Sequence, residues 1–356
     1  MSEKQFSPNG STHISELIRT AVENGSRTAT VTGNWEIETE VRIPSDFTLI
    51  LDGCHLKMAD GVYSNLFVNQ HHNTDIGRTV QGTDRNINIL GRNGAILDGG
   101  TYNGLSERTQ LTNGLPPIWK NNLLLFTNVD GFEIRDFTCQ NQRWWAMNFL
   151  FCCNGTLKNL HFHSNDTAID ENGNVYHGLI HNRYGDVLVK NSDGIDLRQG
   201  CHHITIENIT GFTQDDAVAL TAKDGRLEEA FAVEGLCPDV HHVTVKNVET
   251  SSYCSNMRLL NQGGIKLHDI EIDGIYDTSK DSPYMDRGNY AIRLGDRHLY
   301  GSRQSTREEF YNITVRNIRS RADFAVDLSV EPINLVLENV EAFDGAGLID
   351  DRRDQP

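Results

Sequence analysis

Three aspartates near the middle of the 356-residue chain can move protons: Asp193 and the adjacent pair Asp215 and Asp216. Carboxyl groups held close together repel one another when ionised, so at least one of them should keep its proton to a higher pH. A protonated carboxyl group beside an ionised one suits cleavage of a glycosidic bond, because one group protonates the leaving oxygen and the other activates water. The three residues therefore predict a hydrolytic site, provided that the fold brings them together.

A recurring six-residue pattern predicts the elements that would do so. It reads apolar, polar, apolar, polar, Asn or Asp, apolar, an alternation typical of β-strands. Clear copies cover Phe132–Phe137, Ile204–Ile209, Val243–Val248, Ile270–Ile275 (with Gly at the fifth position), Ile313–Ile318 and Leu335–Val340.

The last five copies start 22 to 43 residues apart, which matches one coil of a parallel β-helix with or without an inserted loop. Equivalent residues of neighbouring coils lie about 4.8 Å apart. Since 22 residues separate Asp193 from Asp215, the repeat places Asp193 beside the Asp215 and Asp216 pair.

The chain contains 32 Asn, a composition that argues against a helical protein because Asn favours turns. Five of them stand at the fifth position of the pattern or of a degenerate copy, where the strand must turn and Asn tolerates the left-handed conformation. Stacked copies could hydrogen-bond along the solenoid. These are Asn159, Asn208, Asn247, Asn317 and Asn339.

We therefore predict an all-β chain, a parallel β-helix forming one catalytic domain over residues 1–356. Residues 11–24 should form an amphipathic helix, with Ile14, Leu17, Ile18 and Val22 on one face, that caps the open N-terminal end. Residues 345–356 are expected to form a loosely held polar tail.

Composition excludes several classes of partner. With 32 Lys and Arg against 49 Asp and Glu, the net charge of −17 argues against binding to nucleic acid or to an anionic membrane. No apolar run approaches the roughly 20 residues that cross a bilayer. The seven Cys show no CxxC pair or disulfide framework, and no secretory signal is visible, so we expect a cytoplasmic protein. A secreted chain from which the leader had been removed would look the same.

Two segments resemble paired signatures of one enzyme family. NSDGID (191–196) followed by TQDDAVAL (213–220) is similar to the motifs of glycoside hydrolase family 28, the polygalacturonases and their relatives. GRNGAILDG (91–99) and NQRWWAMNFLFCC (141–153) resemble further family stretches. The resemblance implies a right-handed β-helix of the pectin lyase type, a carbohydrate substrate, inversion of configuration, and no metal or other cofactor.

Carried over by position, the resemblance implies Asp215 as the general acid. Asp193 and Asp216 would hold and deprotonate the attacking water, and Asn191 would support them as a polar residue.

The chain departs from the family at two motifs. CSNMRLL (254–260) has Asn256 or Met257 where the family has His, and AIRLGD (291–296) has Arg293 but Gly295 where the family has Lys. In polygalacturonases these residues are expected to contact a sugar carboxylate. Arg258 and Arg293 could grip a carboxylate instead, but a neutral or differently charged sugar fits the sequence at least as well.

Other side chains could reach a sugar. An insertion between residues 166 and 186 contains His177, His181 and Arg183, and Trp145 could stack on a sugar ring. The pairs His202-His203 and His241-His242 come just before repeat strands, so turn positions explain them better than a metal site does.

Two alternative functions remain open. One is a calcium-dependent uronate lyase or epimerase on the same fold, because clustered carboxylates can bind Ca²⁺. The other is a non-catalytic solenoid that binds glycans. The sequence does not indicate the sugar, the linkage or the oligomeric state.

Overall fold

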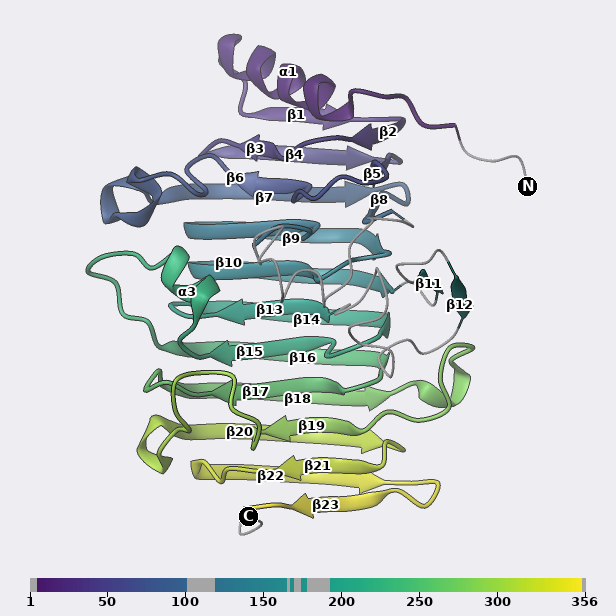
Figure 1. The fold of residues 1–356 in the computed structure, drawn as a ribbon, viewed down its shortest axis with the longest axis vertical. Helices are drawn as coiled ribbons and strands as arrows, with labels where there is room; N and C mark the ends of the chain where they lie inside the picture. Colours follow the sequence, from purple (N-terminus) through teal and green to yellow (C-terminus); the bar gives the residue numbers. More distant parts are fainter. Residues whose placement is uncertain (1–4, 101–118, 165–166, 170–173, 178–192, 354–356) are drawn as a thin grey trace.

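The chain folds as a right-handed parallel β-helix, as the repeat and the resemblance predict (Figure 1). The computed structural model describes residues 5–100, 119–164, 167–169, 174–177 and 193–353. Within them, 21 strands join side by side into one continuous sheet that winds around the core, and every pairing in that sheet is parallel.

One face of the solenoid stacks the repeat strands in chain order. They are β1 (Thr28–Val31), β4 (Phe47–Asp52), β7 (Asp84–Arg92), β9 (Leu124–Gln140), β10 (Trp145–His163), β14 (His202–Thr213), β16 (Val240–Ser252), β18 (Leu267–Asp277), β20 (Phe310–Ser320) and β22 (Ile333–Ala342).

A second face carries the strands that lie between successive repeat strands in the chain. Its members are β3 (Val41–Ile43), β6 (Phe67–Asn69), the first residues of β9 and β10, β13 (Asp193–Arg198), β15 (Val218–Ala222), β17 (Ser255–Asn261), β19 (Tyr290–Leu294), β21 (Phe324–Leu328) and β23 (Gly347–Asp351).

The remaining elements are short. β2 (Asn34–Ile37), β5 (His55–Met58) and β8 (Ile96–Asp98) form a third face with the end of β9, and β11 (Thr167–Ile169) pairs antiparallel with β12 (Val175–His177). A short helix α3 (Arg226–Ala230) follows β15, and single 3-10 turns cover Ile76–Arg78, Val80–Gly82, Ser279–Asp281 and Arg307–Glu309.

The six-residue copies lie in register, one per coil, which confirms the repeat. Their third residues form a continuous apolar row inside the solenoid, because alternate side chains of a strand point to the same side. Burying each such Val, Ile or Leu contributes about 1.5–3 kcal/mol. The row runs Leu49, Ile89, Ile134, Leu157, Ile206, Val245, Ile272, Val315 and Leu337.

The Asn at the fifth position of the repeat form ladders along the solenoid, as predicted. All five have left-handed φ values between 53° and 59°. Asn247 donates to Asn208 over 3.1 Å, and Asn208 donates to Asn159 over 2.9 Å. Asn339 donates to Asn317 over 3.0 Å. Each side chain therefore satisfies its neighbour while its backbone makes the turn.

His203 and His242 occupy equivalent turn positions, with φ of 53° and 51°. Their rings stack at 4.7 Å between centroids, and those of His202 and His241 stack at 4.8 Å. Of each pair, the second histidine therefore makes the expected turn, and the first lies in the strand.

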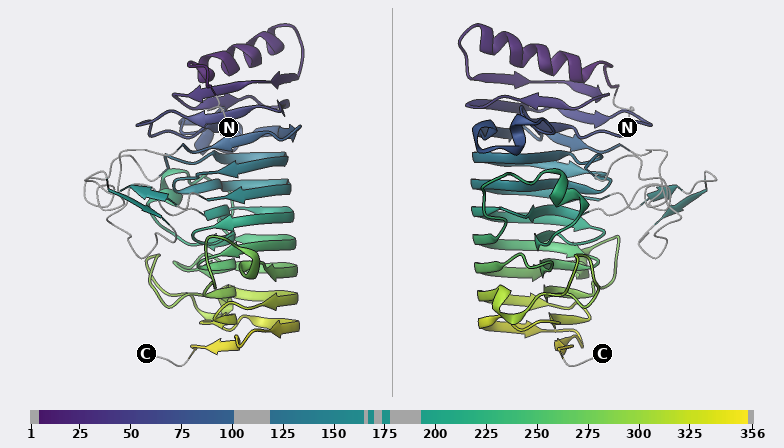
Figure 2. Two further views of the ribbon diagram at one scale, coloured as in Figure 1. Left: turned by 90° about the vertical axis from the view of Figure 1, so that its right-hand side faces the viewer. Right: turned by 60° about the vertical axis from the view of Figure 1, so that its left-hand side comes forward.

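Helix α1 (Gly10–Glu23) covers the N-terminal end of the solenoid, one residue earlier at each end than expected (Figure 2). Ile14 and Ile18 are buried against the first coil, whereas Val22 is 40% exposed and does not belong to the packed face. The buried hydroxyl of Ser11 accepts hydrogen bonds from the backbone N–H groups of Glu38 and Thr39, which fixes the helix to the strand layer.

The C-terminal residues are more ordered than a loosely held tail would be. Gly347–Asp351 forms strand β23, which pairs in parallel with β21. Arg352 then reaches back to the hydroxyl of Tyr290 at 3.2 Å. Among the described residues, every helix is too short or too polar to span a membrane.

Candidate active site

The three aspartates that the sequence singled out lie together on neighbouring coils. Asp193 begins β13, and Asp215 and Asp216 lie in the turn between β14 and β15. The backbone N–H of Gly194 donates to the carbonyl of Asp216 over 3.0 Å, and the N–H of Asp216 donates to Asp193 Oδ1 over 3.2 Å. Asp193 therefore lies one coil from the Asp215 and Asp216 pair, as predicted, and the strand register aligns it with Asp216 rather than with Asp215.

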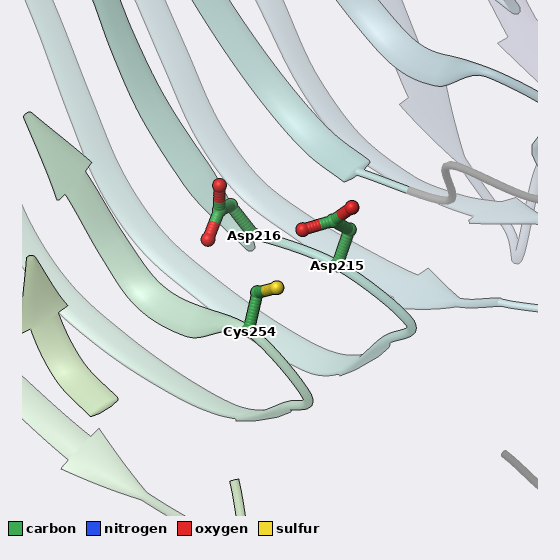
Figure 3. Close-up of side chains that lie close together, drawn as sticks. All are labelled: Asp215, Asp216 and Cys254. Atoms are coloured by element: carbon green, nitrogen blue, oxygen red, sulfur yellow. The ribbon is translucent and has the colours of Figure 1, made fainter. Parts of the chain in front are cut away.

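The three carboxyl groups differ in their contact with solvent. Asp193 and Asp216 are buried, whereas Asp215 is partly exposed on the outer side of the turn. Figure 3 shows Asp215 and Asp216 projecting from the same turn into one space, with Cys254 of the next coil facing them. Asp215 is thus the most exposed of the three carboxyl groups.

Crowding raises the pKa of Asp193 well above its ordinary value. Burial is the largest cause, followed by the charges of Asp215, Asp196 and Asp216, with Arg258 acting in the opposite direction. The direction agrees with the prediction that crowding raises the pKa of at least one carboxyl group of the cluster.

Asp196 extends the cluster by a fourth carboxyl group. It lies within β13 rather than in a turn, is almost completely buried, and accepts a hydrogen bond from Arg198 over 3.2 Å. Burial raises its pKa to about 7 despite the nearby charge of Arg198. Its second oxygen has no hydrogen-bond partner among the described residues.

Asp216 is held by two side chains of the following coil. Arg258 Nη1 donates to Asp216 Oδ2 over 3.2 Å, and the hydroxyl of Ser255 donates to Asp216 Oδ1. The guanidinium group stabilises the negative charge of this buried carboxylate. The cluster therefore places Asp193, whose pKa is raised, beside an Asp216 carboxylate that Arg258 binds.

Arg258 and Arg293 bind carboxylates of the protein itself. Arg258 Nη2 donates to Asp296 over 2.5 Å, and Arg293 donates to Asp296 over 2.7 Å and to Asp327 over 3.3 Å. Both guanidinium groups are therefore engaged by Asp side chains of their own and neighbouring coils, and their predicted contact with a sugar carboxylate stays a prediction.

Asn256, a predicted substrate contact, has its amide engaged inside the protein. It is 2% exposed and donates to the carbonyl and the hydroxyl of Thr250, each over 2.7 Å, so it supports β16. The residue beside the acid pair is Cys254. The 39-residue offset between the repeat copies at Ile204 and Val243 could have found it, because the same offset leads from Asp215 to Cys254.

The thiol of Cys254 completes a group of possible metal ligands. One atom each of Asp215, Asp216 and Cys254 lies within 4.8 Å of the others. The mixture of one thiol and two carboxylates differs from the all-oxygen sets that Ca²⁺ takes. Burial, then the charges of Asp215 and Asp216, raises the pKa of the Cys254 thiol well above its ordinary value, which keeps it protonated.

Trp145 forms part of the wall of the site rather than an open platform. It is 8% exposed, stacks on Trp144 with centroids 6.0 Å apart, and lies 4.4 Å beneath the guanidinium of Arg198. This corrects the expectation of an exposed stacking surface. Arg198 also donates to Glu228 of α3 over 3.0 Å, and Lys223 donates to the same carboxylate over 3.3 Å.

Four predicted ligand contacts stay untested by the geometry. Asn191, His181 and Arg183 lie outside the described residues, and the structure describes only the backbone of His177, in β12.

Comparison with solved structures supports the fold. Polygalacturonase from Erwinia carotovora ssp. carotovora shares 13% identity over 94% of this chain and 93% of its own, with a TM-score of 0.55. A galactohydrolase described as acting on 1,3-alpha-1,4-beta-D-galactose-4-sulfate-3,6-anhydro-D-galactose-2-sulfate shares 10% over 98% and 88%, with a TM-score of 0.62. The tailspike protein of E. coli bacteriophage HK620, solved with a pentasaccharide, shares 13% over 94% and 54%, with a TM-score of 0.55.

Sequence comparison assigns the family. No curated protein sequence matches the chain. The model of glycosyl hydrolases family 28, however, matches residues 36–233, which is more than half of the chain and includes Asp193, Asp215 and Asp216. With the carboxylate cluster and the β-helix in the positions that the resemblance implied, the chain belongs to glycosyl hydrolases family 28.

Proposed function

We propose that this protein is an inverting glycoside hydrolase that cleaves oligosaccharides, polygalacturonase-like in its mechanism. The observation that carries the proposal is the cluster itself: buried Asp193 accepts a hydrogen bond from the backbone N–H of Asp216, Arg258 binds the carboxylate of Asp216, and Asp215 is the more exposed group. Glycosidic cleavage needs a proton donor and an ionised base, and neighbouring carboxyl groups in such different surroundings can supply both.

In the proposed reaction, Asp215 protonates the glycosidic oxygen of the leaving group because it is the most accessible of the three carboxyl groups. Asp193 and Asp216 orient a water molecule on the opposite face of the sugar and accept its proton. The whole solenoid, residues 1–356, serves as one catalytic domain, and no cofactor takes part.

The net charge of −17 supports a carbohydrate substrate over nucleic acid or an anionic membrane. The galactohydrolase and the pentasaccharide-bound tailspike on the same fold also support a glycan ligand.

A screen of pectic and neutral oligosaccharides, followed by anomer-resolved NMR of the first product formed, tests the proposal. We expect the product to have the anomeric configuration opposite to that of the cleaved bond. Retention of configuration would contradict the mechanism.

Three variants then assign the roles: Asp193→Asn, Asp215→Asn and Asp216→Asn should each lower kcat about 10²–10⁴-fold. An aryl glycoside whose leaving group needs no proton should restore turnover in the variant that lacks the general acid. We expect rescue of Asp215→Asn alone, and rescue of Asp193→Asn would instead move the acid role to Asp193. Asp46→Asn is the matched control, because this turn aspartate lies far along the solenoid and only accepts a hydrogen bond from Asn86.

A further inference from the structure

The arginines beside the carboxylate cluster belong to a closed row of ion pairs. Arg258 bridges Asp216 and Asp296, and Arg293 bridges Asp296 and Asp327. Arg352 continues the row, 3.7 Å from Asp327 and 3.9 Å from Asp350. Three guanidinium groups thus meet four carboxylates, so the row has no positive charge left for a ligand.

The cations on the other side of the cluster are matched in the same way. Arg198 contacts both Asp196 and Glu228, and Lys223 contacts Glu228. A sugar carboxylate placed against this cluster would therefore meet the negative charge of Asp216, with the described neighbouring cations already paired inside the protein. Such an arrangement repels an anionic sugar.

An aromatic side chain packs on Arg258, the arginine that binds Asp216. The ring of Tyr300 lies 4.9 Å from the guanidinium of Arg258 and is 46% exposed. The buried side chain of Gln262 fixes its loop, because Gln262 Oε1 accepts from the N–H groups of Tyr300 and Gly301, both over 2.7 Å. Gln262 Nε2 also donates to the carbonyl of His298 over 2.7 Å.

The ring of Tyr300 is therefore held in place before any ligand arrives. A fixed, half-exposed aromatic ring offers the flat apolar surface on which the C–H face of a sugar can pack.

We propose that the sugar unit next to the cleaved bond is neutral and packs on Tyr300, and that the internal pairing of Arg258 and Arg293 excludes uronate units from this subsite. This inference rests on the proposed hydrolase function and adds which class of sugar the site binds.

The preference for a neutral sugar is tested by initial rates of cleavage. Neutral oligosaccharides built from galactose, rhamnose or xylose are compared with oligogalacturonides of the same length. We expect turnover of a neutral oligosaccharide and less than about one hundredth of that rate on oligogalacturonides. Tyr300→Ala should raise KM for the neutral substrate about tenfold or more, and Tyr300→Phe should restore it because the ring makes the contact. Equal or faster cleavage of oligogalacturonides, or an unchanged KM in Tyr300→Ala, would overturn the inference.

Removing a carboxylate partner of Arg258 and Arg293 tests whether their pairing inside the protein excludes uronate units. Asp296→Asn removes one carboxylate shared by Arg258 and Arg293, and should tighten binding of a trigalacturonate inhibitor about tenfold, with Asp327→Asn as a second variant should the first not fold. Asp46→Asn should leave that inhibition unchanged. Unaltered inhibition in folded Asp296→Asn and Asp327→Asn would contradict the proposal.

Binding measured by NMR titration separates this inference from the proposed function. In one outcome, a neutral trisaccharide binds the native protein but not Tyr300→Ala, while none of the oligosaccharides is cleaved. That result would contradict the proposed hydrolase function and support the neutral subsite on Tyr300. Preferential binding of trigalacturonate, or binding of neither sugar, would overturn the subsite whatever the activity.

Discussion

Arg258 donates a hydrogen bond to Asp216 from the next coil of the solenoid, over 3.2 Å, in a region where both side chains are almost shielded from solvent. Burial disfavours the charge of Arg258, but Asp216 and then Asp296 raise its pKa above the ordinary value. The pair thus fixes a permanent cation behind a carboxylate that the proposed reaction needs in its ionised form.

Replacing Arg258 should therefore weaken catalysis at low pH first. In Arg258→Met, the negative charge of Asp216 loses its cation, so the acidic limb of the kcat profile should move to higher pH and the maximal kcat should fall about 10- to 100-fold. The maximal kcat and the acidic limb of Arg258→Lys should lie between those of the native protein and those of Arg258→Met. The pH dependence of kcat measures this, with Arg319→Lys on the exposed face of β20 as the control. An acidic limb that stays in place would show that Arg258 only supports the fold.

Asp196 should make the protein less stable as pH rises toward neutral. Its pKa in the folded chain is about 7, above the ordinary carboxyl value, so the folded state binds this proton more tightly than the unfolded state. The resulting stabilisation is complete below about pH 4 and is lost as pH rises through about 7. Melting temperatures between pH 5 and pH 8 should fall in the native protein, with a shallower slope in Asp196→Asn. The Asp46→Asn control should keep the native slope, and an equally steep slope in Asp196→Asn would contradict the assignment.

The Asn ladder should contribute measurably to stability at Asn208. Asn208→Ala loses the hydrogen bonds to Asn159 and from Asn247 and places a Cβ residue without local hydrogen bonding at φ 57°. We expect a loss of about 1–3 kcal/mol in the free energy of unfolding, since the left-handed conformation and the lost bonds each cost about 1 kcal/mol. Asn208→Gly should lose less, because glycine adopts this φ freely. Urea denaturation measures both, and equal losses would show that backbone strain plays no part.

The Cys254 thiol should react slowly with alkylating agents in the native protein. Its pKa is raised well above normal by burial and by Asp215 and Asp216, so little thiolate forms near neutral pH. Cys237, which is exposed, should be labelled first. Time-resolved labelling with iodoacetamide and peptide mapping checks this order. Faster labelling of Cys254 than of Cys237 would contradict the raised pKa.

Hydrolysis by carboxyl groups should not depend on a divalent cation. After treatment with EDTA and exchange into metal-free buffer, we expect unchanged kcat and no absorbance from an unsaturated sugar product. Loss of activity that Ca²⁺ restores, together with an unsaturated product, would favour the uronate lyase alternative.

The repeat in the sequence was enough to predict the coil and the placement of Asp193 beside Asp215 and Asp216. Both follow from local rules: side chains alternate along a strand, Asn accepts the left-handed turn, and neighbouring coils stack at a constant spacing. The same rule, applied with the 39-residue offset, would also have placed Cys254 beside the pair. Matching a motif by its letters pointed instead to Asn256, which the strand register buries against Thr250.

The sequence by itself thus determined the solenoid, its turn ladders and the carboxylates that meet on one face, because these depend on periodicity and on residues one coil apart. Only the tertiary structure decided which carboxyl groups have a raised pKa and which carboxylates bind the arginines, because both depend on burial and on partners from several coils. Arg258 and Arg293 show the difference. In the sequence they are two cations suited to a sugar carboxylate, whereas in the fold Asp216, Asp296 and Asp327 have already bound them.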